Sequence, residues 1–382
     1  MAKFLNSLIA AALLLAAGPA VTNQTPEWAS HLQSRGIRIS AGVWDLSTGK
    51  VIEAFQPELG LIPASTTKVV SSYAILKTLK PDYQLVTTVS GALQDGVVSG
   101  DLVFSSQGDP FLTNEHIWMI IQQLKTKGLT RVSGRLKLDQ SAFDPQRFGT
   151  GWENTARYTT PPILPLSVNF NRERDGRITG NPEKLARDTI TSIFDGVGIH
   201  FDNHPDSGGE KAVLATHKSP PLRNLVDSVN KISNNFMIEM LVKHFGEGSW
   251  AKGIDRIQDF YNTSLNLTPT DVMITDGSGL SKSNRLSART LSIILRAGWN
   301  DFEVGPEFVS SLKYLGGDEH LTKLKDPNLT RRVRCKTGHL NDVDSMCGFI
   351  QMPDGSVRVF AIILNGPCLR EDVEHILKLW AN

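Results

Sequence analysis

Apolar and polar positions near the start of the chain predict a β-hairpin followed by a helix. Two alternating stretches, 38–44 and 51–55, flank the polar turn Asp45–Lys50. After Pro63 the apolar residues recur at helical spacing until a second proline ends the pattern: they are Val69, Val70, Tyr73, Leu76 and Leu79. This spacing predicts a helix over about 64–80 with one apolar face.

The end of the chain carries a second set of regular elements. Residues 332–337, 346–351 and 357–364 are typical of strands, with a hairpin turn at Pro353–Gly355, and residues 371–380 are typical of a helix. Strands and a helix at both ends of the chain predict one antiparallel sheet that is built from both termini and covered by helices.

The middle of the chain has a different pattern. From 84 to 216, short β-like runs are separated by Gly, Asp and Pro, and Pro220 and Pro221 mark the return of helical periodicity. We therefore expect an α/β (α+β) main domain made of residues 21–83 and 217–382, interrupted by a β-rich accessory domain over 84–216.

Composition and charge narrow the classes of function. The 382 residues contain 40 Lys and Arg against 39 Asp and Glu, which gives a net charge of +1. A chain of this length holds more than one domain. Its balanced charge argues against a nucleic-acid binder that depends on a broad basic face.

The first twenty residues predict a secretory signal peptide. Lys3 precedes the apolar run 8–17, which ends in the small residues Gly18–Ala20. The run is shorter than the roughly 20 residues that a membrane-spanning helix needs. We expect residues 1–20 to be a signal peptide and the protein to be exported to the periplasm.

Three cysteines, Cys335, Cys347 and Cys368, lie close together in the sequence near its end. Three thiols allow one disulfide and leave one thiol over, and the sequence does not choose among the three pairings or exclude buried free thiols. Neither the cysteines nor the scattered histidines have the spacing of a metal site. We expect no metal and no cofactor.

Three short motifs in a fixed order carry the candidate chemistry: Ser65-Thr-Thr-Lys68, Ser233-Asn-Asn235 and Lys336-Thr337-Gly338. The first two types are common by chance, since S-x-x-K also begins at positions 47, 228 and 310. The motifs become informative because they occur in this order and because each lies in a predicted element that suits its chemistry.

A serine beside a lysine is a recognisable nucleophile pair. Ser65 and Lys68 are three residues apart at a predicted helix start, so their side chains share one face. A serine hydroxyl reacts when a neighbouring base takes its proton, and a lysine serves when burial or a second cation such as Lys336 lowers its pKa. Gly338, in a predicted edge strand, leaves space for a substrate, and the strand can supply a backbone N–H to an oxyanion hole together with Ser65.

The chain resembles the low-molecular-mass penicillin-binding proteins that are D-alanyl-D-alanine carboxypeptidases/endopeptidases with an insert after the first motif. The three motifs belong to a set that penicillin-binding proteins and class A β-lactamases share. The resemblance extends to the segments Pro63–Val69, Gly100–Phe104, Gly108–Pro110, Asp276–Ser281 and Asn284–Ser287. It implies a transpeptidase/β-lactamase-like fold.

The resemblance also implies a role for each motif residue. Ser65 would be the acylated nucleophile and Lys68 its general base. Ser233 would pass a proton to the leaving amine, and Asn235 would hold the substrate amide. The substrates would be peptidoglycan stem peptides, and β-lactam antibiotics would be covalent inhibitors.

The third motif would bind the terminal carboxylate of the substrate through Lys336 and Thr337, with Gly338 beside it. The next residue, His339, departs from the family, which usually has a hydroxyl residue at this position. A histidine donates a hydrogen bond most strongly when protonated, so we expect an unusual pH dependence. The insert is also shorter than in the longer members of the family.

Two other functions remain open on the sequence alone. A β-lactamase or esterase on the same scaffold would turn β-lactams over rapidly. A cell-wall peptide-binding protein would have kept the fold and lost the chemistry, but a binder has no need of Ser65, Lys68, Ser233, Asn235 and Lys336 together. The oligomeric state is not readable from the sequence.

Overall fold

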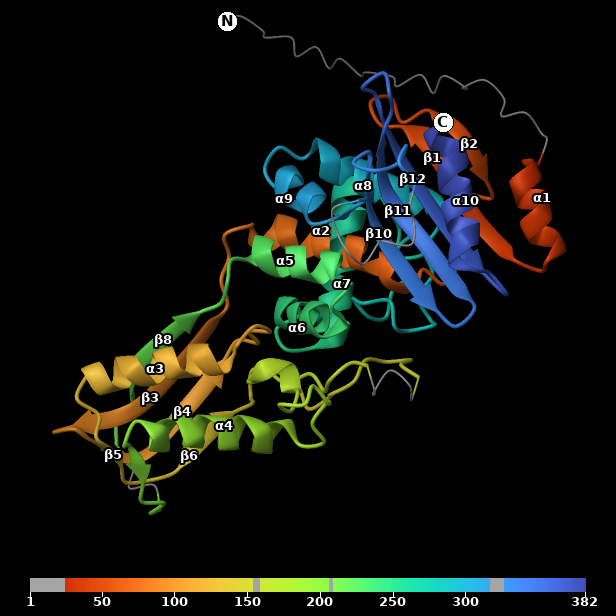
Figure 1. Ribbon diagram of the computed structural model, residues 1–382. Coiled ribbons are helices and arrows are strands. Elements are labelled where there is room, and N and C mark those ends of the chain that lie inside the picture. The colour runs from red at the N-terminus through yellow and green to blue at the C-terminus, as the bar shows by residue number, and fades with distance from the viewer. Residues whose placement is uncertain (1–24, 154–158, 206–208, 317–325) are drawn as a thin grey trace, which may run out of the picture.

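The computed structural model describes residues 25–153, 159–205, 209–316 and 326–382 (Figure 1). The predicted signal peptide lies outside these ranges. Two separate six-stranded sheets organise the described residues. No helix in this part of the chain is long and apolar enough to cross a membrane.

The first sheet has the strand order β2-β1-β12-β11-β10-β9, and every neighbouring pair is antiparallel. Its strands are β1 (Arg38–Asp45), β2 (Val51–Phe55), β9 (Lys313–Tyr314), β10 (Val333–Leu340), β11 (Val343–Gln351) and β12 (Val357–Asn365). β1 pairs with β12 along its whole length, so strands from the two ends of the chain lie side by side. The predicted antiparallel sheet built from both termini is confirmed.

Helices cover both faces of this sheet (Figure 1). α1 (Glu27–Ser34) and α10 (Arg370–Ala381) pack on one face, where Trp28 and Trp380 meet edge to face. The other face packs against a larger set: α2 (Thr67–Leu79), α5 (Leu222–Lys231), α6 (Asn235–Phe245), α7 (Trp250–Leu265), α8 (Ala288–Asn300) and α9 (Gly305–Ser310).

Strand β12 shows why the apolar pattern of the central strands is continuous. Its alternate residues belong to opposite cores, with Phe360 and Ile362 facing the α1–α10 side and Ala361 and Ile363 facing the other helices. Because successive strand residues point to opposite faces, a strand that is covered on both faces must be apolar throughout. Burying the sheet on both sides fixes the position of β10, which carries the third motif.

The second sheet has the order β7-β5-β4-β3-β8, and β6 also pairs with β4. Its strands are β3 (Val86–Gln94), β4 (Val97–Ser106), β5 (Arg131–Val132), β6 (Leu136–Asp139), β7 (His200–Phe201) and β8 (Ala212–Lys218). β3 is antiparallel to β4 and β8, while β5 and β6 run parallel to β4. β8 continues past residue 216, where the sequence pattern placed the end of the insert.

The insert is less dominated by strands than its sequence predicts, because two helices pack on its sheet. α3 (Asn114–Thr126) buries Ile117, Ile120, Ile121 and Leu124, and α4 (Pro182–Gly196) buries Ala186, Ile190 and Phe194. Both sets have helical spacing. The sequence analysis missed these helices because their remaining positions are polar and the neighbouring segments are rich in turn residues.

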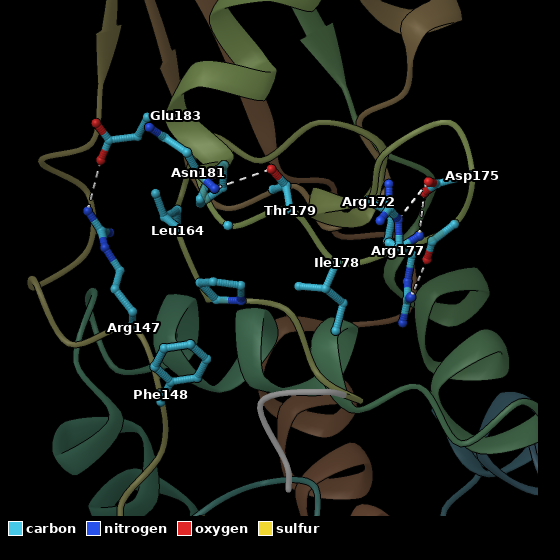
Figure 2. A pocket seen from close by; sticks show the side chains of 14 residues that line it. Arg147, Phe148, Leu164, Arg172, Asp175, Arg177, Ile178, Thr179, Asn181 and Glu183 are labelled. Carbon is cyan, nitrogen blue, oxygen red and sulfur yellow. Dashed lines mark hydrogen bonds and ion pairs between the residues drawn. The ribbon is translucent and has the colours of Figure 1, made fainter. Parts of the chain in front are cut away.

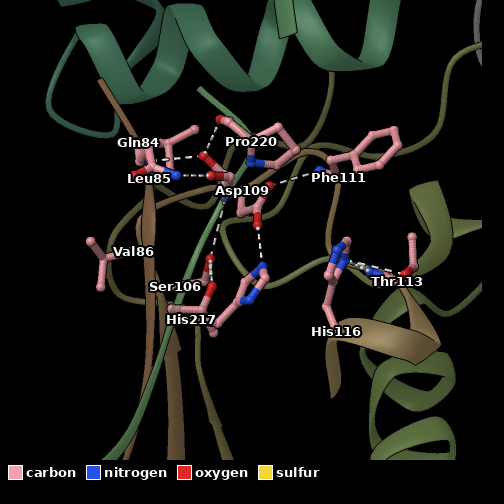
Figure 3. Close-up of polar contacts among 12 residues, drawn as sticks. Gln84, Leu85, Val86, Ser106, Asp109, Phe111, Thr113, His116, His217 and Pro220 are labelled. Carbon is pink, nitrogen blue, oxygen red and sulfur yellow. Dashed lines mark hydrogen bonds and ion pairs between the residues drawn. The ribbon is translucent and has the colours of Figure 1, made fainter. Parts of the chain in front are cut away.

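Two chain segments connect the sheets, and they are hydrogen bonded to each other (Figure 3). Leu85 N donates to Ser219 Oγ (2.9 Å), and Ser219 N donates to the Leu85 carbonyl oxygen (2.8 Å). Nearby, the fully buried Asp109 lies 3.5 Å from His217 Nε2, and the His217 ring stacks on His116. Two hydrogen-bonded chain segments with polar side chains around them therefore join the two sheets, rather than a single linker.

None of the three cysteines is part of a disulfide. Cys335 and Cys347 lie on the adjacent strands β10 and β11, but Cys335 packs into the α1–α10 core and Cys347 into the opposite core. Their side chains therefore project from opposite faces of the sheet. Burial raises the pKa of Cys347 above its usual range.

Candidate active site

Ser65 lies in a short 3-10 turn, Ala64–Thr66, which leads directly into α2. Ala64 has a left-handed backbone conformation (φ 48°), and Thr66 Oγ1 closes the turn by donating to the Pro63 carbonyl oxygen (2.7 Å). A strained backbone of this kind persists where surrounding contacts hold it, and it occurs often at functional sites. Ala64 and Thr66 are buried while Ser65 is half-buried, so the turn presents the Ser65 side chain.

Lys68 lies one helical turn further on and is fully buried. Its Nζ donates to Ser65 Oγ (3.0 Å), Asn235 Oδ1 (2.6 Å) and the Ser278 carbonyl oxygen (2.8 Å). Burial lowers the pKa of Lys68 from 10.5 to about 7, against the opposing effect of nearby carboxylates. Near neutral pH a substantial fraction of Lys68 is therefore an uncharged amine, which can accept the Ser65 proton.

The second motif occupies the connection between α5 and α6. Ser233 has a left-handed backbone conformation (φ 57°), and Asn234 caps α6 by accepting from Met237 N (3.0 Å). Asn235 is the first residue of α6, and its Nδ2 donates to Thr160 Oγ1 (3.3 Å). The helix cap is thus Asn234, which leaves the side chains on either side of it free to face the site.

The third motif lies on β10, and its lysine reaches the second motif. Lys336 is fully buried, and its Nζ donates to Ser233 Oγ (2.9 Å) and to the Thr337 carbonyl oxygen (2.7 Å). Burial lowers the pKa of Lys336 well below its usual value, and the positive charges of Lys68 and Lys313 lower it further.

Gly338 allows β10 to lie directly against the turn Ala64–Thr66. A Cβ atom at this position would stand 2.8 Å from Ser65 N and 2.9 Å from the Pro63 carbonyl oxygen. Any side chain would therefore separate the strand from the turn. Among the described residues, β9 pairs with β10 only at Arg334 and Cys335, so the edge of β10 beside Gly338 is open.

Thr337 and His339 are the two remaining residues of the predicted site. Thr337 is half-buried, and the His339 side chain is 70% exposed. His339 Nδ1 lies 3.2 Å from Oδ2 of the buried Asp344, which also pairs with Arg370 (2.7 Å). Within the described part of the chain, no hydrogen bond joins either side chain to Ser65.

Sequence reasoning missed part of the support around Lys68. The turn Asp276–Ser281 supplies the Ser278 carbonyl. The buried Asp276 holds this turn by accepting from Gly279 N, Ser281 N and Asn284 Nδ2. Glu239, fully buried on α6, accepts from Gly277 N and Ser278 N. The position of a backbone carbonyl cannot be read from a sequence. Glu239 could have been noticed, because it is the one charged residue in the apolar run 236–242.

The insert contacts the site through Thr160, which accepts from Asn235 Nδ2. Pro162 and Leu164 of the same segment line a cavity of about 900 Å³, together with Phe148 and a group of charged residues (Figure 2). Arg147 and Glu183, both in this lining, pair at 3.2 Å. Its described lining includes none of the predicted site residues. In the described ranges, no three His, Cys, Asp or Glu side chains gather into a metal site.

A serine hydrogen bonded to a buried lysine, beside an antiparallel sheet flanked by helices, places the chain in the predicted transpeptidase/β-lactamase-like fold class. Sequence comparison identifies the family. The chain matches the D-Ala-D-Ala carboxypeptidase 3 (S13) family over residues 27–175 and 171–379, and it belongs to that family of hydrolases. The predicted resemblance, fold class and enzyme class are confirmed.

Similar proteins agree with this assignment. A carboxypeptidase of Mycobacterium tuberculosis is 25% identical over 90% of this chain and 80% of its own length. The D-alanyl-D-alanine carboxypeptidase DacB of Haemophilus influenzae is 22% identical over 84% of each chain. The crystal structure of penicillin-binding protein 4 (DacB) from Haemophilus influenzae has the same fold, with a TM-score of 0.82, 18% identity, and coverage of 94% of this chain and 100% of that one. That protein has also been solved in complex with a β-lactam.

Proposed function

We propose that this protein hydrolyses the D-Ala-D-Ala amide of peptidoglycan stem peptides through an acyl-enzyme on Ser65. The observation that carries the proposal is the 3.0 Å hydrogen bond between Ser65 Oγ and Nζ of the buried Lys68. Since Lys68 is an amine of lowered pKa beside a half-exposed hydroxyl, the pair has the geometry of a nucleophile and its base.

Acylation begins when Lys68 Nζ takes the Ser65 proton and Ser65 Oγ attacks the carbonyl carbon. Ser65 N–H and a backbone N–H on the open edge of β10 stabilise the developing oxyanion. The proton then passes from Lys68 through the Ser233 hydroxyl to the leaving amine, the C–N bond breaks, and D-alanine leaves. Water attacks the ester, Lys68 takes the proton of that water, and Ser65 Oγ is released as a hydroxyl.

Binding of the substrate is assigned to the residues around this pair. Asn235 holds the substrate amide, and Lys336 and Thr337 bind the terminal carboxylate beside Gly338. Lys336 is suited to this task because it is fully buried and already fixed by Ser233. His339, exposed at the end of this edge, is placed to assist in carboxylate binding when it is protonated.

The same groups would react with β-lactams, which offer a strained amide and a carboxylate. The β-lactam complex of the Haemophilus protein supports this extension. We also propose that the chain is exported to the periplasm, where its substrate lies, after cleavage near Ala20 of the predicted signal peptide. N-terminal sequencing of the mature protein would test the cleavage position.

Release of D-alanine from a diacetyl-L-Lys-D-Ala-D-Ala peptide tests the proposed reaction. We expect Ser65→Ala and Lys68→Met to lower the rate by about 10³-fold or more while the protein stays folded. Release at an unchanged rate by Ser65→Ala would exclude this mechanism. A wild-type protein that binds the peptide without cleaving it would be a cell-wall binder, and rapid loss of free penicillin would identify a β-lactamase.

A further inference from the structure

Glu239 is a buried carboxylate that none of the three motifs contains. It lies on α6 four residues after Asn235, so the two side chains lie on the same face of the helix. It is fully buried. Burying a carboxylate costs free energy unless hydrogen bonds compensate, so its partners show what it does in the fold.

Those partners connect Glu239 to the proposed base. Its Oε1 accepts from Ser278 N (2.7 Å), and its Oε2 accepts from Gly277 N (3.2 Å) and Trp250 Nε1 (2.9 Å). The carbonyl oxygen of the same Ser278 accepts from Lys68 Nζ (2.8 Å). Residue 278 is thus held by Glu239 through its N–H and contacts Lys68 through its carbonyl.

We propose that Glu239 is a positioning residue with two effects: it holds the Ser278 carbonyl against Lys68, and its negative charge sets how readily Lys68 keeps a proton. This inference rests on the proposed role of Lys68 as the base. Glu239 does not touch the substrate, and it acts through Lys68.

The electrostatic surroundings of Lys68 support the second effect. Glu239 from α6 and Asp276 from the adjoining turn raise the pKa of Lys68, against the larger lowering by burial, and Lys336 approaches from β10. Burial and the charge of Asp276 raise the pKa of Glu239 itself, whereas its three hydrogen bonds lower it. The ionisation of Glu239 therefore bears on that of Lys68, whose pKa its charge raises.

Two conservative substitutions separate the two effects. Glu239→Gln removes the charge and places an amide NH₂ against backbone N–H donors. Glu239→Asp keeps the charge but withdraws it by one methylene from Ser278 N. The matched control is Asp101→Asn, which removes another buried carboxylate, on β4 of the second sheet, where Asp101 accepts from Arg135 N and pairs with Lys137.

The measurement is the second-order rate of acylation by a fluorescent penicillin from about pH 5 to pH 9, the range in which groups of pKa near 7 titrate. Acylation needs uncharged Lys68, so its rate rises with pH. Without the Glu239 charge the pKa of Lys68 falls. We therefore expect the rising, acidic part of the pH–rate profile (the acid limb) to move to lower pH by about one unit in Glu239→Gln. In Glu239→Asp the acid limb should stay at the wild-type pH, and the maximal rate of acylation should fall by about tenfold.

A purely structural role predicts a different result. In that case all three variants would lose thermal stability, and the acid limb would stay at the wild-type pH in each. A folded Glu239→Gln protein with an unmoved limb would overturn the inference. If Glu239→Gln does not fold, Trp250→Phe replaces it: loss of one donor raises the pKa of Glu239, so the limb should move in the same direction by less, and an unmoved limb again overturns the inference.

The proposed function fails in a separate way. If Ser65→Ala is still acylated by the penicillin, the nucleophile has been misassigned, whatever Glu239 does. If Ser65→Ala is inert and the Glu239 variants behave like wild type, only the inference about Glu239 is wrong.

Discussion

Lys336 Nζ donates to Ser233 Oγ at 2.9 Å, which joins the first residue of the third motif to the first residue of the second. The two residues come from β10 and from the connection between α5 and α6, which are far apart in the sequence. Lys336 is fully buried, so a charged lysine at this place costs folding free energy. The presence of a lysine here is explained by the carboxylate binding that we assign to Lys336 and by its hydrogen bond to Ser233, through which the proposed proton transfer passes.

Replacing Lys336 should therefore separate activity from stability. We expect Lys336→Met to lower kcat/KM for the D-Ala-D-Ala peptide by about 100-fold, because a fixed cation facing the substrate is lost. The melting temperature should stay the same or rise, because a buried charge is replaced by an apolar side chain of similar length. A large fall in melting temperature with unchanged kcat/KM would contradict this assignment. Lys218→Met, at an exposed position on β8, is the control.

Gly338 should be the position where the smallest change has a large effect. In Gly338→Ala the new methyl group would meet Ser65 N at 2.8 Å, so the strand or the nucleophile turn must shift. We expect acylation by penicillin to slow by about tenfold or more, and unfolding free energy to fall by about 1–3 kcal/mol. Gly196→Ala, where a Cβ meets nothing within 4 Å, should leave both quantities close to wild type. Equal behaviour of the two variants would contradict the predicted contact.

The lowered pKa of Lys68 also predicts how stability depends on pH. Its folded-state pKa of about 7 lies below the ordinary value of 10.5, so the unfolded chain binds this proton more readily. The contribution of Lys68 to unfolding free energy is present above about pH 10.5 and is lost as pH falls to about 7. Urea unfolding at several pH values should show a smaller loss over this window in Lys68→Met. If unfolding free energy changed with pH by the same amount in wild type and in Lys68→Met, Lys68 would not be buried as described.

His339 should contribute to substrate affinity. Its side chain is exposed on the edge of β10, where a ring N–H can donate to the substrate carboxylate. We expect His339→Ala to raise KM for the D-Ala-D-Ala peptide by a few-fold and to leave kcat close to wild type. A KM unaltered by the substitution would show that His339 has no part in binding.

Sequence reasoning succeeded where a pattern and a physical requirement coincide. The central strands had to be apolar because both faces of their sheet are covered, and α2 had to begin after Pro63 and end before Pro81. The motif residues Ser65, Lys68 and Lys336 do approach their expected neighbours. Their roles in catalysis stay predictions.

The missed features have physical causes as well. α3 and α4 are amphipathic helices that pack on a small sheet. Their buried residues recur at helical spacing, but the many polar residues between them made this spacing hard to recognise in the sequence. The Ser278 carbonyl is a backbone atom, so its approach to Lys68 depends on a turn conformation rather than on a side chain. Glu239 was visible as an isolated charge in an apolar stretch, and such residues merit inspection because a buried charge needs a reason.

The central claim is that Ser65, activated by Lys68, is the residue that becomes acylated. The most direct measurement is intact-protein mass spectrometry after incubation with benzylpenicillin, followed by peptide mapping of the adduct. The account predicts one penicilloyl group on Ser65, no adduct on Ser65→Ala, and adduct formation in Lys68→Met that is slower by about 10³-fold. An adduct that persists in Ser65→Ala, or one that maps to another serine, would contradict it.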